Sequence, residues 1–117
     1  MITTIIPKLP FIDKQKTLDF YCNQLECRLL SDYGDYLILK IDDSELHFFS
    51  FQSLIKEQSD FMVYLRIDSE IEKYYKQIQK NNVAIHPNGK LEEKPWNQKE
   101  FAILDPNGTL LTFGQAL

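Results

Sequence analysis

The chain of 117 residues lacks most of the features that mark specialised classes of protein. It contains two cysteines, Cys22 and Cys27, and two histidines, and their spacing matches no zinc site. No apolar run approaches the roughly 18 residues of a membrane-spanning helix, and the first residues lack the apolar core of a signal peptide. We therefore expect a cytoplasmic protein with free thiols and no membrane contact.

Basic residues are also scarce. The 13 Lys and Arg residues stand against 17 Asp and Glu residues, which gives a net charge of -4. A protein that binds nucleic acid usually presents a basic face, so we expect no nucleic-acid partner and a neutral or cationic ligand instead. The sequence has no glycine-rich phosphate loop, and no serine or cysteine lies in a context typical of an activated nucleophile.

The segment from Phe101 to Gly114 is the strongest pattern that the chain does contain. Two apolar runs flank Asp105-Pro106-Asn107-Gly108, where asparagine and glycine tolerate the positive φ of a tight turn, so the segment predicts a β-hairpin. An offset of 65 residues aligns this hairpin with residues 38–48. The aligned pairs include Ile38 and Ile103, Leu46 and Leu111, and Phe48 and Phe113. The match suggests an internal duplication within what is, by length, about one domain.

The first half of the chain predicts the order strand, helix, strand, strand, strand. Asp13 can cap a helix, and the apolar residues that follow it have helical spacing. Pro7 and Pro10 interrupt the first strand, which places that strand at a sheet edge or at a subunit junction. The predicted strands cover residues 4–12, 28–31, 36–41 and 45–51.

The second half predicts the same order of elements. Asp68 or Ser69 can cap a helix that carries Ile71, Tyr74, Tyr75 and Ile78 on one face and ends near Asn81-Asn82. A strand at 61–67 precedes this helix, and a short strand at 83–86, a polar loop at 87–98 and the hairpin follow it. The predicted fold class is therefore α+β, with two tandem βαβββ modules, about residues 1–57 and 58–117, in a single domain.

One face of each predicted sheet is covered by a helix and the other face is open. Strand side chains alternate between the two faces, so the leucines and phenylalanines of the aligned pairs share the covered face. The residues next to them then line an open hollow, where a binding site is expected. These residues are His47, Phe49, Thr112 and Gly114.

Several motifs resemble those of the bleomycin resistance proteins, which belong with glyoxalase I and the extradiol dioxygenases to the vicinal oxygen chelate superfamily. The motifs are Leu9-Pro10 before Asp13, Phe20-Tyr21, Leu46 to Phe49, Pro95-Trp96, and Glu100-Phe101-Ala102 before Asp105-Pro106-x-Gly108. Glu26-Cys27 departs from the Gly-Phe that these proteins usually carry. The resemblance implies a glyoxalase/bleomycin-resistance-type fold and a strand-exchanged homodimer with clefts between its two chains.

Enzymes of this superfamily bind a divalent metal. The resemblance places the four ligand positions near Ile6, at His47, near Met62 and at Thr112. Only His47 among these has a side chain that binds metals well. We therefore expect no metal, no cofactor and no enzymatic activity, and we expect His47 to hydrogen-bond a neighbour in the cleft wall.

The resemblance assigns Trp96, the only tryptophan, as a plate that stacks on a flat ligand. Tyr36 is the expected opposite plate, and Tyr33 is its substitute. The carboxylates of Asp32, Asp35, Asp60 and Glu45 are expected to supply charge complementary to the cationic end of a bleomycin-like glycopeptide. The resulting hypothesis is antibiotic resistance by sequestration, in which the bound drug cannot reach DNA and is not chemically changed.

Three alternatives stay open on the sequence. Trp96 can be a lid that packs on its own core or on a second subunit. The chain can be a metal-dependent enzyme of the same superfamily, similar to a glyoxalase or a dioxygenase. It can also bind another flat small molecule or a protein partner, because aromatic walls tolerate many ligands. All of these alternatives share the predicted fold and dimer.

Overall fold

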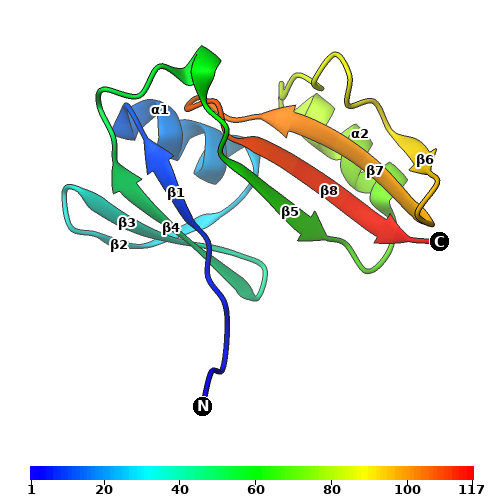
Figure 1. Cartoon of the computed structure of the whole chain (residues 1–117), viewed down its shortest axis with the longest axis horizontal. Coiled ribbons are helices and arrows are strands. Elements are labelled where there is room, and N and C mark those ends of the chain that lie inside the picture. The colour runs from blue at the N-terminus through cyan, green and yellow to red at the C-terminus, as the bar shows by residue number, and fades with distance from the viewer.

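The computed structural model describes residues 1–117 and contains two four-stranded sheets that lie side by side (Figure 1). The first sheet has the order β1-β4-β3-β2 and the second has the order β5-β8-β7-β6. In each sheet the strand that comes first in the chain is parallel to the strand that comes last, so β1 is parallel to β4 and β5 to β8. The other neighbouring strands are antiparallel. The strands are β1 (Lys8–Phe11), β2 (Arg28–Asp32), β3 (Tyr36–Ile41), β4 (Ser44–Ser50), β5 (Met62–Arg66), β6 (Glu92–Lys94), β7 (Gln98–Leu104) and β8 (Leu110–Ala116). The matching orders confirm the predicted α+β fold with two βαβββ modules.

A helix follows the first strand of each module. In the first module α1 (Lys14–Leu18) continues into a π-helical segment, η1 (Asp19–Gln24). Asp13 caps α1 as predicted, because its carboxylate accepts a hydrogen bond from the backbone N of Lys16 at 2.9 Å. The second module has α2 (Ile71–Lys80), and a 3-10 turn, η2 (Lys56–Gln58), precedes β5.

The start of α2 differs from the prediction. Glu70 precedes the helix in the left-handed region, with a φ of 59°, and its side chain makes no capping hydrogen bond. The backbone N of Ile71 donates instead to Oε1 of Gln115 on β8, at 2.9 Å. The predicted cap by Asp68 or Ser69 is therefore wrong, because a side chain distant in sequence accepts from the free end of the helix.

The edge of the second sheet also differs from the prediction. Residues 83–86 form no strand, and β6 lies instead inside the predicted polar loop. The chain before β6 still runs beside β7, because His86 N donates to Ala102 O and Ala102 N donates to Gly89 O, both at 2.9 Å. Pro87 lacks the N–H that a longer strand would need, and an exposed edge strand such as β6 needs no apolar pattern.

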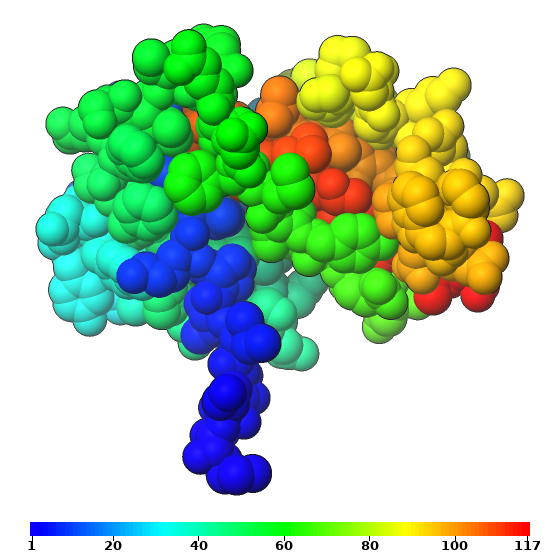
Figure 2. All heavy atoms as spheres, viewed as in Figure 1, coloured from blue at the N-terminus to red at the C-terminus, as the bar shows by residue number.

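The N-terminal segment, residues 1–7, leads away from the rest of the molecule (Figures 1 and 2). Residues 1–5 are exposed, whereas Ile6 and Pro7 are half-buried. The first strand begins only at Lys8, so the predicted strand over residues 4–12 is too long. The last backbone contact of the segment is the hydrogen bond from His47 N to Pro7 O, at 3.1 Å. Ile2 and Ile5 are consequently 88% and 90% exposed, although apolar side chains are stabilised by burial.

The covered faces of both sheets meet in one apolar core of 17 residues. Leu46 and Phe48 of β4 and the aligned Leu111 and Phe113 of β8 are all buried, which confirms the predicted alternation. Phe113 stacks on Phe101 of β7 with ring centroids 4.9 Å apart. The alternate residues of the same strands therefore occupy the opposite, open faces.

A buried carboxylate joins the two modules. Asp105 precedes the turn between β7 and β8, and its Oδ2 accepts a hydrogen bond of 2.6 Å from the hydroxyl of Tyr21 on η1. Its Oδ1 accepts from the backbone N atoms of Asn107 and Thr109, at 2.8 and 2.9 Å. Burial raises the pKa of Asp105, and these hydrogen bonds oppose the rise.

The next residues of the turn complete this junction. Oδ1 of Asn107 accepts a hydrogen bond from the backbone N of Ile12, at 2.8 Å. Gly108 has a φ of 83°, and a Cβ atom added there would overlap the carbonyl of Lys56 in η2. The Asp105-Pro106-Asn107-Gly108 motif therefore makes a hairpin turn and also fixes one module against the other.

We expect Asp105→Ala to lower the free energy of unfolding by at least about 3 kcal/mol, because it leaves three buried donors without an acceptor. The midpoint of urea unfolding measures this loss, with an unchanged m-value as evidence of a two-state comparison. Asp43→Ala is the matched control, since Asp43 lies in an exposed turn. Equal losses in the two variants would show that Asp105 does not stabilise the junction.

Candidate ligand-binding site

The open face of the first sheet carries a chain of three hydrogen-bonded side chains. The hydroxyl of Tyr36, at the start of β3, lies 2.8 Å from Nδ1 of His47 on β4. Nε2 of His47 lies 2.9 Å from Oε1 of Glu45. The carboxylate of Glu45 can only accept, so Nε2 of His47 is the donor in this hydrogen bond. The predicted hydrogen-bonding role of His47 thus has a definite partner on each side.

The hydrogen bond to His47, which is itself held by Glu45, orients the ring of Tyr36. Its plane is nearly perpendicular to that of His47, at 84°, and the centroids are 5.5 Å apart. Nζ of Lys8 lies 5.4 Å from the centroid of Tyr36. Phe49 follows the buried Phe48 on β4 and lies on the open face with His47. Its ring is half-buried and packs near Phe61, with ring centroids 6.1 Å apart.

The acidic residues that were expected to face a ligand are spread over different surroundings. Asp32 binds Nζ of Lys14 at 2.9 Å and accepts from the backbone N of Gly34 at 2.8 Å. The hydrogen bonds from Gly34 and Lys14 lower the pKa of Asp32. Asp35 is exposed in the turn between β2 and β3, and Asp60 is exposed in the connector before β5. The three carboxylates therefore form no common cluster.

Trp96 projects from the turn between β6 and β7. Pro95, Trp96 and Asn97 form a three-residue hairpin loop, in which Asn97 has a φ of 62° and its N donates to Lys94 O. The fixed φ of proline and the tolerance of asparagine for positive φ explain why this sequence turns here. The indole is 59% exposed, so Trp96 is not a lid on its own core.

A carboxylate on β7 holds the indole of Trp96. Nε1 of Trp96 donates to Oε2 of Glu100 at 2.8 Å, and the hydroxyl of Tyr64 on β5 donates to the same oxygen at 2.8 Å. The guanidinium of Arg66 lies 5.5 Å from the centroid of the Tyr64 ring. Burial and the hydrogen bond to Glu100 raise the pKa of Tyr64, so its hydroxyl remains a donor at neutral pH.

Tyr64 covers Gly114, one of the residues expected to line the hollow. A Cβ atom added at Gly114 would overlap the hydroxyl of Tyr64, so only glycine lets the ring lie there. Thr112 is half-buried on the same strand and pairs with Tyr64 across the sheet. Glu100 and Tyr64 are not among the site residues predicted from the sequence. The alternation of β5 nevertheless places Tyr64 on the same face as its partner Thr112.

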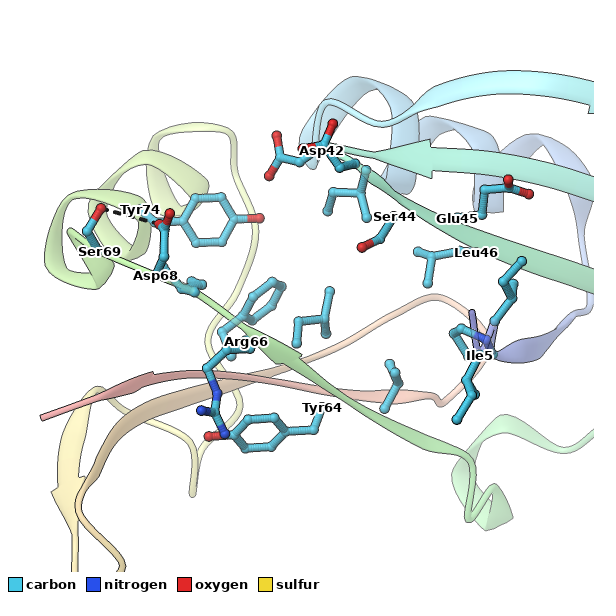
Figure 3. A pocket seen from close by; sticks show the side chains of 18 of the residues that line it. Ile5, Asp42, Ser44, Glu45, Leu46, Tyr64, Arg66, Asp68, Ser69 and Tyr74 are labelled. Carbon is cyan, nitrogen blue, oxygen red and sulfur yellow. Dashed lines mark hydrogen bonds between the residues drawn. The ribbon is translucent and has the colours of Figure 1, made fainter. Parts of the chain in front are cut away.

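The two aromatic groups do not meet within one chain. Tyr33 lies in the turn between β2 and β3, and Tyr36 is the first residue of β3. Trp96 follows β6, and these elements lie at opposite ends of the molecule (Figure 1). A cleft of about 1270 Å³ lies instead between the modules (Figure 3). Its walls include Ile5, Glu45, Tyr64 and Arg66, but apart from Glu45 none of the residues predicted to bind ligand. Within one chain the aromatic residues predicted to bind ligand therefore share no cleft; the clefts that the sequence predicts lie between two chains.

The side chains on the open faces do not suit a metal ion. No three His, Cys, Asp or Glu side chains come together anywhere in the chain in an arrangement that could hold one. Both ring nitrogens of His47 already have hydrogen-bond partners, and Met62 and Thr112 offer no strong ligand. In addition, no helix of the chain combines the length and apolar character required to cross a lipid bilayer.

Comparison with known proteins identifies the family. Residues 8–113 match the family model described as the glyoxalase/bleomycin resistance protein/dioxygenase superfamily. The chain belongs to this superfamily. Its curated relatives include bleomycin resistance proteins of Geobacillus stearothermophilus and Staphylococcus aureus, each 27% identical over 96% of both chains.

Solved structures of the same superfamily resemble the chain over almost its whole length. A bleomycin-binding protein in complex with bleomycin has a TM-score of 0.87 and 27% identity, covering 99% of this chain and 100% of that one. A bleomycin resistance determinant encoded on the transposon Tn5 has a TM-score of 0.87 and 28% identity, covering 98% of each chain. The family resemblance that the Pro95-Trp96 and Asp105-Pro106-x-Gly108 motifs predicted is thus confirmed.

We expect Gly114→Ala to push the ring of Tyr64 off the sheet and to break its hydrogen bond to Glu100. Loss of this hydrogen bond should return the pKa of Tyr64 towards its usual value of about 10. NMR titration of the tyrosine ring carbons measures the shift. Tyr74, on the helix-covered side, is the internal control; an unchanged Tyr64 titration beside a folded spectrum would contradict the packing.

Proposed function

We propose that the protein binds bleomycin-family glycopeptide antibiotics without chemical change and confers resistance by sequestering them. The observation that carries this proposal is the exposed indole of Trp96, whose N–H is tied to Glu100 while much of the ring stays accessible. A large aromatic ring presented in this way suits stacking on a planar heteroaromatic group. The related bleomycin-binding protein was solved with that drug bound, which supports this ligand class.

A homodimer would bring the two aromatic groups together. In an isologous dimer each contact occurs twice, so Trp96 of one chain and Tyr36 of the other would form two equivalent clefts. The exposed Ile2 and Ile5 of the N-terminal segment support an exchange of this segment between the chains, because a second copy would bury them. The open faces of the two sheets would then face each other across the dimer.

The charges of the first module suit a cationic drug. Asp35 in the turn beside Tyr33 and Tyr36 is exposed, and Asp60 is exposed in the connector. Exposed carboxylates mainly increase the rate of association with a cation and add little to affinity. Asp32 is already paired with Lys14, so we propose that it stabilises the turn and does not contact the drug.

Binding of bleomycin should quench the fluorescence of Trp96, the only tryptophan, and saturate at about one drug per chain. Trp96→Ala should abolish the binding heat in calorimetry at tens of micromolar drug, while Ile55→Ala, an exposed apolar change in the connector, should leave it intact. Tyr36→Ala and Tyr33→Ala identify the opposite plate by the larger loss. If the wild-type protein shows neither fluorescence quenching nor binding heat, bleomycin is not its ligand.

Mixing two defective chains tests whether each cleft uses both subunits. If Trp96 and Tyr36 act across the interface, a heterodimer of Trp96→Ala and Tyr36→Ala chains contains one intact cleft and one doubly altered cleft. Random exchange of subunits should then restore about one quarter of the wild-type sites. Calorimetry before and after mixing measures the recovery. Absence of recovery, with dimers confirmed by light scattering, would show that Trp96 and Tyr36 do not form a shared cleft across the interface.

A further inference from the structure

The indole of Trp96 is more restrained than its exposure suggests. An exposed tryptophan on a hairpin turn is free to adopt several rotamers, and fixing one of them on binding costs conformational entropy. Trp96 has one polar tether, the 2.8 Å hydrogen bond from Nε1 to Glu100. The position of the indole plane therefore depends on how firmly the carboxylate of Glu100 is held.

Glu100 is held by the sheet itself. It is only 6% exposed, and its backbone pairs with Gly114 of β8 on one side and with Glu92 of β6 on the other. Its Oε2 also accepts the hydroxyl of Tyr64, which reaches across β8 from β5. One carboxylate oxygen thus receives two donors that come from opposite edges of the sheet.

Tyr64 is restrained in turn. Its ring lies against Gly114, the single residue type that leaves room for it, and the guanidinium of Arg66 lies over the ring. Figure 3 shows Tyr64 and Arg66 beside each other at the wall of the cleft between the modules. Tyr64, Glu100 and Trp96 consequently form a connected unit that spans the open face of the second sheet.

We propose that Glu100 and Tyr64 are positioning residues that hold Trp96 ready to stack on a ligand. The inference rests on the proposed function in so far as Trp96 is the stacking plate. The charged acceptor strengthens the indole N–H hydrogen bond, and the second donor keeps the carboxylate from rotating away. A ligand then meets a ring that is already in place.

Time-resolved anisotropy of the single tryptophan tests the restraint in the protein without ligand. Glu100→Met removes the acceptor at similar length and should increase the fast, local depolarisation of Trp96 and its quenching by acrylamide. Tyr64→Phe keeps the acceptor and should give a smaller change in the same direction. Glu93→Met is the matched control, because Glu93 lies on neighbouring β6, is exposed, and makes no hydrogen bond to Trp96.

Bleomycin titration of the same variants measures the consequence for binding. Glu100→Met should weaken the affinity about three- to tenfold, the cost of ordering one side chain, and Glu93→Met should not change it. Unaltered Trp96 anisotropy in Glu100→Met would overturn the positioning role, whatever the drug does. If Trp96 loosens but the wild-type chain binds no bleomycin, the positioning role stands and the proposed ligand does not.

Discussion

The carboxylate of Asp105 is the contact on which the arrangement of the two modules depends. Burying a carboxylate is costly unless donors surround it, and Asp105 receives them from Tyr21 in the first module and from its own turn in the second. Because these donors belong to both halves, the carboxylate is satisfied only when the modules lie in this one relation. The direction in which each open face points follows from that relation.

A second carboxylate, Glu100, has a related geometry and a different consequence. Both residues accept from a tyrosine that lies on another element, but the second donor of Glu100 is the N–H of an exposed indole. The first sheet repeats the theme with Glu45, His47 and Tyr36, where the chain of hydrogen bonds ends on a half-buried ring. On each open face, therefore, an acidic group fixes an aromatic side chain in place.

Much of this fold could be predicted from the sequence, because strand alternation and the turn motif are local signals. The repeat of Leu46 and Phe48 in Leu111 and Phe113 identified the covered faces correctly. Features that depend on distant partners could not be predicted. The cap of α2 by Gln115 requires β8 to lie beside the helix, and β6 forms from charged residues because β7 supplies its hydrogen bonds.

The sequence predicts aromatic residues for the candidate site, but it does not predict the side chains that hold them. Trp96 and Tyr36 are the stacking residues that the sequence predicts. The network through Glu100 and Tyr64 depends on the pairing of β5 with β8 and of β8 with β7, which only the folded sheet creates. Tyr64 also covers Gly114 beside Thr112, the position where the family resemblance would place a metal ligand. Tyr64 therefore presents an aromatic surface beside Thr112, whose neutral hydroxyl is a weak ligand for a divalent ion. The chemistry of this face suits contact with a planar group better than coordination of a metal ion.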